Sequence, residues 1–270
     1  MSTATASHAS VASDQRFQGL SHVAIACADL SASLQFYTNV LGYAEHCRLN
    51  YQGTDRLMLV CLKISDDQWL ELFDGRNLPA GVPALHQVAV RTSSAEDCRA
   101  RLATFGHPVP DRVWQGQMRN FGFTTPDPRE VTIEFVEATG ESWMTRDRGQ
   151  FLPAERISSR IIEAGIAGPV DSAAVQSFYG ECLGLGVTVA SDGTWTVPVA
   201  PVNGQGPVER IVGDPRATAA WFTLQVANLE DVQARLGRTS GEIPVIPVIA
   251  TTRQITLRDP DGMLIHLVAA

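Results

Sequence analysis

The sequence predicts an α+β protein of four βαβββ modules, which pair into two cup-shaped, curled mixed β-sheets with helices outside. Three observations support this prediction. A strand, a helix and three more strands are expected in succession within residues 22–73, the same order returns within residues 85–136, and the C-terminal part of the chain repeats segments of both. A single module leaves one face of its sheet uncovered, so two modules together enclose a cup.

The first module begins with HVAIACADLSASLQFYTNVLGY, which starts at His22. Alternation of β-branched and small residues predicts a strand over 22–27. Asp29 can cap a helix whose apolar residues recur every three or four positions, and Gly42 is placed where a left-handed C-cap ends it. Three further strands are expected, at 46–49, 57–64 and 68–73.

The other modules follow by repetition. The second is expected to contain a strand over 85–91, a helix over 95–105 ended by Gly106, and strands over 109–113, 120–124 and 131–136. A third copy appears because AGIAGPVDSAAVQSFYGECLG aligns with the first module without a gap. A fourth aligns LEDVQARL with AEDCRARL and ends in DPDGMLIHLV where the second ends in PDPREVTIEFV.

The chain is therefore expected to form two domains of two modules each. Residues 18–149 make the N-terminal domain and residues 150–270 the C-terminal one, with the boundary placed near Gly149 in a charged connecting segment. Residues 1–17 lack the basic start and the apolar centre of a signal peptide and are expected to be a flexible tail.

Composition limits the partners. A net charge of -8 and a pI near 5.2 disfavour nucleic acid and anionic membrane surfaces. No apolar stretch is long enough for a membrane span. Five scattered cysteines without a Cys-x-x-Cys pair favour a reducing, cytoplasmic environment over a disulfide framework. A small-molecule substrate is expected, in a monomer or a homodimer.

Four residues occupy matched places in the first two modules. His22 and His86 open the first strands, and Glu71 and Glu134 lie in the last strands, each between apolar neighbours that face the opposite way. The repeat predicts that all four converge in the N-terminal cup on one divalent metal ion, which could be Fe, Mn, Co, Ni or Zn. Metal sites of this kind leave positions open for substrate.

The C-terminal half serves as an internal comparison. In the alignment, Ala164 and Ala220 take the places of the two histidines, while Glu209 and His266 take those of the two glutamates. The fold therefore does not need the histidines, which favours a ligand role for them, and the second cup is expected to be degenerate and metal-free. Trp69, Phe121 and Phe123 are candidates for lining the first cup beside the metal.

The chain resembles the vicinal oxygen chelate (VOC) superfamily over nearly everything after residue 17, and the segments that carry the resemblance are HVAIACADLSASLQFYTNVLGY, PDPREVTIEF and DPDGMLIHL. This superfamily includes glyoxalase I, epimerases, extradiol dioxygenases and bleomycin-resistance proteins. The resemblance to bacterial glyoxalase I implies metal ligation by His22, Glu71, His86 and Glu134. The resemblance to extradiol dioxygenases implies instead a metal-binding triad of His22, His86 and Glu134. The tyrosine that their motif expects four residues before Pro126 is replaced by Gly122.

The favoured function is a metal-dependent isomerase, epimerase or lyase that chelates adjacent oxygens of a small hydroxy or keto compound. Glu71 or Glu134 would act as the base that moves a proton between carbons. The first alternative is an Fe(II)-dependent ring-cleaving dioxygenase of catechol-like compounds. The second is a metal-free protein that binds a small molecule, as resistance proteins do.

Overall fold

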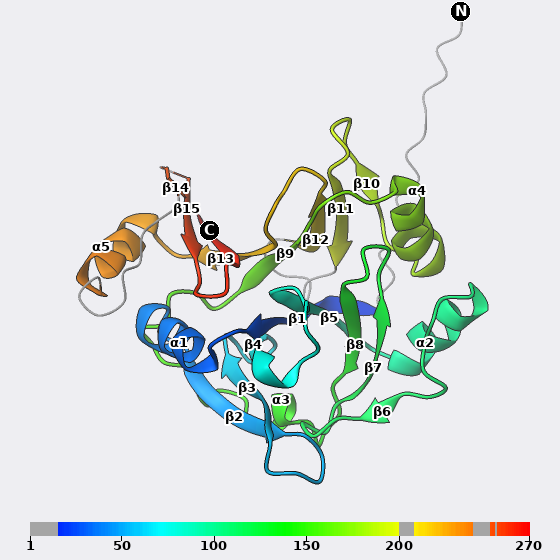
Figure 1. Cartoon of the computed structure of the whole chain (residues 1–270), viewed down its shortest axis with the longest axis horizontal. Coiled ribbons are helices and arrows are strands. Elements are labelled where there is room, and N and C mark those ends of the chain that lie inside the picture. Colours follow the sequence, from blue (N-terminus) through cyan, green and yellow to red (C-terminus); the bar gives the residue numbers. More distant parts are fainter. Residues whose placement is uncertain (1–15, 200–207, 240–248, 252) are drawn as a thin grey trace, which may run out of the picture.

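Two eight-stranded mixed sheets, one from each half of the chain, form the body of the molecule (Figure 1). The computed structural model describes residues 16–199, 208–239, 249–251 and 253–270, so most of the predicted tail lies outside the described residues. The strand orders are β2-β3-β4-β1-β5-β8-β7-β6 and β10-β11-β12-β9-β13-β16-β15-β14, which are the same topology used twice. The predicted four-module α+β fold is confirmed.

The strands of the first sheet are β1 (Phe17–Cys27), β2 (Ala44–Asn50), β3 (Leu57–Lys63), β4 (Trp69–Asp74), β5 (Leu85–Thr92), β6 (Trp114–Gln115), β7 (Phe121–Pro126) and β8 (Thr132–Glu137). Its helical segments are α1 (Leu30–Gln35), the wide-turned η1 (Phe36–Val40), η2 (Gly75–Asn77), α2 (Ala95–Thr104) and α3 (Trp143–Arg146). Residues 109–113 are described but do not form the predicted strand, since Pro108 and Pro110 cannot donate the hydrogen bonds that a strand ladder needs.

The second sheet contains β9 (Ile161–Ala167), β10 (Thr188–Val189), β11 (Trp195–Val199), β12 (Glu209–Asp214), β13 (Trp221–Val226), β14 (Ile249–Ala250), β15 (Gln254–Arg258) and β16 (Leu264–Ala269). Its helical segments are α4 (Ser172–Val175), η3 (Gln176–Cys182) and α5 (Leu229–Thr239). The connection between the two sheets runs over 138–160. No helix in the described part of the chain is both long and apolar enough to cross a membrane.

Local signals in the first module act as predicted. Asp29 accepts hydrogen bonds from the backbone N–H groups of Ser31 and Ala32 and so begins α1. Gly42 has φ of 77°, a left-handed conformation that ends the helical segment and leads into β2. Leu30, Phe36, Tyr37 and Val40 are buried on the side of this segment that faces the protein.

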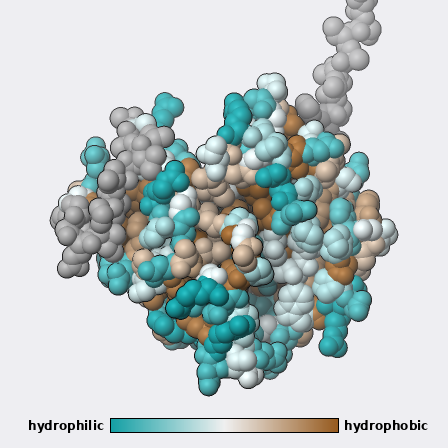
Figure 2. Space-filling model, in the orientation of Figure 1, coloured by the Kyte–Doolittle hydropathy of each residue, from teal (hydrophilic) through white to brown (hydrophobic). Residues whose placement is uncertain are grey.

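One hydrophobic core extends through both halves, and it includes β1 residues such as Ile25 as well as β16 residues such as Leu267. A second, smaller apolar cluster around Cys61, Trp69 and Met118 lines the inside of the N-terminal cup. On the face shown in Figure 2, hydrophobic residues appear as small patches between hydrophilic ones. The sheets therefore share a core on their helix-covered sides, while the cup has an apolar lining of its own.

Two reciprocal hydrogen bonds join the halves. Tyr37 of the first module donates to Asp259 in the turn of the fourth module at 2.7 Å, and Tyr179 of the third module donates to Asp127 in the turn of the second at 3.2 Å. Figure 1 shows the same pairing of modules, with α1 near α5 on one side and α2 near α4 on the other. Each half thus completes its outer layer with a helix of the other.

These two aspartates give the folding free energy a distinctive pH dependence. Burial raises the pKa of Asp127 and of Asp259 to about 6. Because the folded pKa lies above the ordinary value, the native state binds more protons than the unfolded state, and stability falls as pH rises from about 4 to 6, by up to about 3 kcal/mol for each group.

We expect Asp127→Asn and Asp259→Asn to flatten this part of the stability profile, which urea unfolding at several pH values between 4 and 7 will measure. The exposed Asp55→Asn variant is the matched control and should keep the wild-type slope. A wild-type slope in both buried variants would contradict the assignment.

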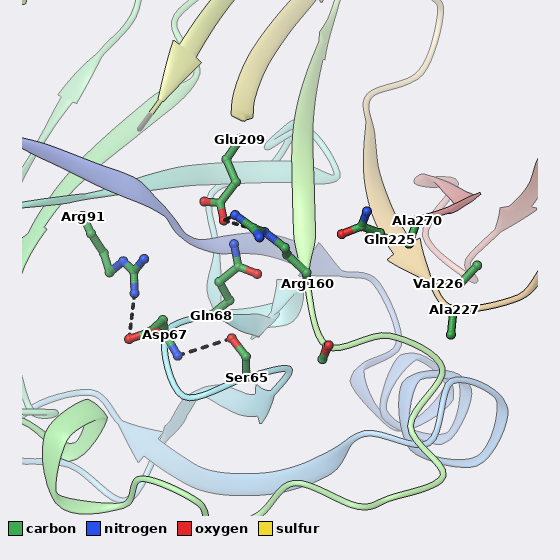
Figure 3. Close-up of a pocket in the computed structure, with 11 residues that line it drawn as sticks. Ser65, Asp67, Gln68, Arg91, Arg160, Glu209, Gln225, Val226, Ala227 and Ala270 are labelled. Atoms are coloured by element: carbon green, nitrogen blue, oxygen red, sulfur yellow. Dashed lines mark hydrogen bonds and ion pairs between the residues drawn. The ribbon is translucent and has the colours of Figure 1, made fainter. Parts of the chain in front are cut away.

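Polar side chains also connect the two halves of the chain. Gln68 donates to the carbonyl of Ile161 and accepts from its N–H group, and Glu209 accepts from the N–H group of Leu20. Figure 3 shows Glu209 and Arg160 from the second half facing Gln68 and Arg91 from the first, around a cavity of about 470 Å³. These contacts fix the start of β1, on which the site described below depends.

Candidate functional site

The centre of the first sheet places two polar side chains in equivalent positions. β1 and β5 are antiparallel, with His22 opposite Ala89 and Ala24 opposite Gln87. In each pair, a polar residue of one strand lies opposite the alanine that follows two residues after the polar residue of the other strand, so a local twofold axis relates the two strands. By this symmetry, Gln87 of the second module occupies the position that His22 occupies in the first.

The flanking parallel strands add two carboxylates by the same relation. Glu71 in β4 lies beside Ala24, and Glu134 in β8 lies beside Ala89. Because side chains alternate along a strand, Glu71 and Glu134 share the cup face with His22. Gly122 in β7 leaves room at this point, since a Cβ atom there would lie 2.8 Å from the carbonyl oxygen of Phe135 and 3.3 Å from the Glu134 carboxylate.

Three of the four predicted ligands meet. His22 Nε2 lies 3.2 Å from Glu134 Oε2 and 3.6 Å from Glu71 Oε2. The Gln87 amide nitrogen lies 3.0 Å from His22 Nε2 and also donates to Glu134 Oε2. The cluster therefore consists of one imidazole, two carboxylates and one amide.

His86 is the predicted ligand that the structure does not bring to this cluster. The register shifts between the pairs Ala24–Gln87 and Ile25–Leu85, so His86 is the extra residue of a β-bulge. Its ring packs edge-on against Phe73, with the ring centroids 4.7 Å apart. Within the described residues, no hydrogen bond or ion pair joins it to His22, Glu71 or Glu134.

A sequence signal for Gln87 was available. The strand with His22 reads His-Val-Ala-Ile-Ala, and the strand of the second module reads Gln-Val-Ala-Val-Arg from Gln87. In both, a small alanine two residues after the polar residue lies beside the acidic residue of the neighbouring parallel strand. An alignment that places His86 on His22 misses this relation by one residue, because His86 is the bulge residue that precedes Gln87.

A cavity of about 350 Å³ opens beside the cluster, a size suited to a small ligand. Trp69 lines it as predicted. Phe121 and Phe123 do not, because they lie on the other face of β7: Phe121 is exposed, and Phe123 is buried in a stack with Phe135. Their cup-facing neighbours in β7 are Gly122 and Thr124.

The titratable groups of the lining are His22, Glu71 and Glu134. Burial disfavours the charged form of His22, but the nearby Glu71 and Glu134 carboxylates outweigh it and raise the imidazole pKa. Burial raises the pKa of Glu71 to about 7; His22 opposes this shift and the charge of Glu134 adds to it. Both shifts reflect two carboxylates held close to one imidazole, and a cation bound among them would favour their ionised forms.

The C-terminal cup differs from the predicted alignment. Thr223 lies beside His266 in β16 and opposite Glu163 in β9, while Gly165 lies opposite Trp221 and beside Val212. The places of His22, Glu71, Gln87 and Glu134 are therefore taken by Glu163, Val212, Trp221 and His266.

Ala164 instead lies in the core, and Glu209 faces the other half of the molecule. Glu163 is engaged by Trp221 at 2.6 Å, Arg210 at 2.6 Å and Thr223 at 3.2 Å. Its carboxylate therefore already has protein partners.

The N-terminal cluster fits a divalent cation by donor type and spacing. Among the described residues, no group of three or more His, Cys, Asp and Glu side chains has an arrangement that encloses a metal as it stands. The 3.2 Å from His22 Nε2 to Glu134 Oε2 lies within the roughly 3.0–3.4 Å between neighbouring ligands bonded at about 2.1 Å to one ion, and the 3.6 Å to Glu71 Oε2 slightly exceeds it. Rotation of the Gln87 amide would present its oxygen as a fourth donor.

Comparisons with known proteins agree with this architecture. The family model for the glyoxalase/bleomycin resistance protein/dioxygenase superfamily matches residues 19–135, and no curated protein matches the sequence. The matched residues include both N-terminal modules, which carry the site.

Solved structures extend the likeness over the C-terminal half. The Mn(II)-bound glyoxalase from Novosphingobium aromaticivorans is 15% identical with a TM-score of 0.66, over 94% of this chain and 82% of that one. A catechol 2,3-dioxygenase is 13% identical with a TM-score of 0.68, over 94% and 88%. The 2,3-dioxygenase LapB from Pseudomonas sp. KL28 is 18% identical with a TM-score of 0.66, over 94% and 92%. At these identities the likeness defines the fold and not the reaction.

Proposed function

We propose that the protein is a divalent-metal-dependent enzyme of the isomerase, epimerase or lyase type, acting on a small, uncharged hydroxy or keto compound in the N-terminal cup. The observation that carries the proposal is the convergence of His22, Glu71 and Glu134 beside a partly open cavity, with Gln87 as the equivalent of His22. If these residues served only as an ion pair that stabilises the fold, they would not need a cavity beside them.

His22, Glu71 and Glu134 would hold the cation, and Gln87 would add its amide oxygen. When bound, the ion supplies Lewis acidity toward adjacent substrate oxygens. The two carboxylates balance the charge of a divalent cation. A neutral substrate then enters a site with no net charge.

Glu71 is the better placed of the two carboxylates to act as a base. Its side chain is 10% exposed, against 20% for Glu134, so less water competes for it. Gln87 donates a hydrogen bond to Glu134, whereas no hydrogen bond to the Glu71 carboxylate occurs within the described residues. Once it leaves the cation as substrate arrives, Glu71 can take a proton from the carbon next to a substrate carbonyl and return it to the neighbouring carbon.

The rest of the lining indicates the kind of substrate. Among the described residues, the cavity is lined by no lysine, arginine or tyrosine. Amide groups that could hydrogen-bond to hydroxyl and carbonyl oxygens come from Gln52, Gln115, Gln117 and Asn120. Trp69, Phe73 and Trp114 provide apolar surface. A compact, neutral, oxygen-rich compound suits this lining better than an anionic conjugate does.

Gln87 weighs against the dioxygenase alternative. A 2-His-1-carboxylate set, typical of non-haem Fe(II) oxygenases, requires a second imidazole. The equivalent of His22 is an amide here, and His86 packs on Phe73 instead. Glu71 adds a second carboxylate, which such a triad does not contain.

Metal loading followed by paired assays tests the proposal. We expect chelator-treated protein to rebind one Mn²⁺ per chain, and the loaded protein to exchange carbon-bound protons of small 2-hydroxy ketones with solvent deuterium. Fe²⁺-loaded protein given catechol in air should consume no oxygen. Oxygen uptake with ring cleavage would establish the dioxygenase instead, and failure to bind Mn²⁺, Fe²⁺, Co²⁺, Ni²⁺ or Zn²⁺ would favour the metal-free binding protein.

A further inference from the structure

Two cysteines face each other across neighbouring strands of the N-terminal cup. Cys47 in β2 and Cys61 in β3 are direct partners in the antiparallel ladder, and both are free thiols. Residues directly opposite in such a ladder have Cα atoms about 4.5–5.5 Å apart. A disulfide requires about 4.4–6.8 Å, so this pair can be bridged with little movement of the backbone.

The pair differs in accessibility. Cys61 is fully buried in the apolar lining, whereas Cys47 is partly exposed on the edge strand of the sheet. Cys61 is also the ladder partner of Glu71, so Cys47, Cys61 and Glu71 follow one another across three strands on one face. A reagent can therefore reach Cys47 first, and Cys61 lies directly behind it.

His46 and Asp147 lie near the partly exposed Cys47. The ladder shifts between Glu45 and Cys47, which makes His46 a bulge residue. His46 Nε2 lies 2.8 Å from Asp147 Oδ2, and the imidazole is 1% exposed. Its other nitrogen, Nδ1, is buried, and no described residue makes a hydrogen bond of ordinary geometry to it, although the Cys47 thiol lies next to the ring.

Aromatic side chains hold this imidazole in place. The ring centroids of Trp69, Trp143 and Phe151 lie 5.5, 5.8 and 4.9 Å from that of His46. Asp147 is itself fixed by two hydrogen bonds of 2.6 Å from Arg146. The order thiol, imidazole, carboxylate matches the arrangement by which a base and an orienting acid activate a nucleophile.

We propose that Cys47 is a reactive thiol that reduces small hydroperoxides, with Cys61 as the resolving thiol that closes a cross-strand disulfide beside Glu71. This site is separate from the proposed metal chemistry. Its reactant is an electrophilic peroxide oxygen that reaches the edge strand.

The electrostatics agree with this geometry. Contact with Cys61 and with His46 lowers the pKa of the Cys47 thiol, against the effect of burial. Burial disfavours the charged form of His46, but contacts with Cys47 and Asp147 outweigh it and raise the imidazole pKa. In contrast, contact with Cys47 and burial raise the pKa of the Cys61 thiol, and burial raises the pKa of the Cys27 and Cys182 thiols, so Cys47 ionises before these three.

The chemistry balances in two steps. The Cys47 thiolate attacks one peroxide oxygen, so that an S–O bond forms, the O–O bond breaks, and the leaving hydroxide or alkoxide takes up a proton. Cys61 then attacks the resulting sulfenic acid, so that the S–S bond forms and water leaves. The two sulfurs lose two electrons, and the hydroperoxide accepts them.

Peptide mass mapping of the reduced full-length protein tests the proposal. We expect one equivalent of hydrogen peroxide to give a Cys47–Cys61 disulfide as the first oxidised product. Iodoacetamide at neutral pH should modify Cys47 at least roughly tenfold faster than Cys27, Cys98 or Cys182 in the folded protein. Equal rates for Cys47 and these buried thiols, or a different first pairing, would overturn the proposal.

Variants separate the two roles. In Cys61→Ser, peroxide should leave Cys47 as a sulfenic acid that a 1,3-dione traps, and no disulfide should form. Cys98→Ser, which removes a buried thiol elsewhere, should leave the reaction unchanged. His46→Gln should slow alkylation of Cys47 about tenfold with the circular dichroism spectrum preserved. If a correctly folded His46→Gln protein is alkylated at the wild-type rate, the imidazole has no part in activating Cys47.

Discussion

Replacing His22 with alanine is expected to lower the affinity for Mn²⁺ at least roughly 100-fold, since loss of even an outer-shell partner costs about 10–100-fold. The imidazole lies between the two carboxylates, 3.2 Å from Glu134 and 3.6 Å from Glu71, so no other donor in the described part of the cup can take its place. Isothermal titration with Mn²⁺ measures the effect.

The matched control is His86→Ala. Both variants remove one imidazole from a central strand, but only His22 faces the cluster. His86→Ala should keep wild-type affinity, and Gln87→His should strengthen binding by replacing an amide with an imidazole. If His86→Ala loses the metal while His22→Ala keeps it, the register assignment of the site is wrong.

Glu71→Gln is expected to lower the rate of proton exchange roughly 10²–10⁴-fold, the usual contribution of a positioned general base. Glutamine has nearly the same shape and can still offer an oxygen to the cation, but it cannot accept the substrate proton. The readout is deuterium exchange in small 2-hydroxy ketones, followed by nuclear magnetic resonance, alongside the metal content of each sample.

Glu163→Gln is the control for this variant, because Glu163 is a half-buried cup carboxylate of the second half without a place in the proposed site. It should leave exchange unchanged. A Glu71→Gln protein that keeps its metal and its full rate would remove Glu71 from the role of base. Glu134 would then be the remaining carboxylate in the cavity.

The fold could be predicted from the sequence because its signals are local and repeated. The first module has a helix cap at Asp29, a helix end at Gly42 and alternating residues within β1. Related signals recur in the other modules, so each copy supports the prediction for the others. The strand expected at 109–113 was wrong because Pro108 and Pro110 flank Val109, and the edge strand β6 forms at Trp114–Gln115 instead.

The site was only partly predictable. His22, Glu71, Glu134 and Trp69 lie at the cup as expected, because strand alternation assigns each to a face. His86, Phe121 and Phe123 do not, since His86 is a bulge residue whose counterpart in β1 is Ser21 and not His22, and the facing of β7 depends on pairing with β8. Bulges arise from the ladder hydrogen bonds between strands, so counting residues along one strand does not locate them.

The crosswise bonds Tyr37–Asp259 and Tyr179–Asp127 bear on how the two halves depend on each other. Each duplicated segment lends a helix to the opposite sheet, so the chain folds as one interlocked body and neither half is self-sufficient. The C-terminal half has a task of its own in such a body, because its Glu209 braces β1, the strand that carries His22.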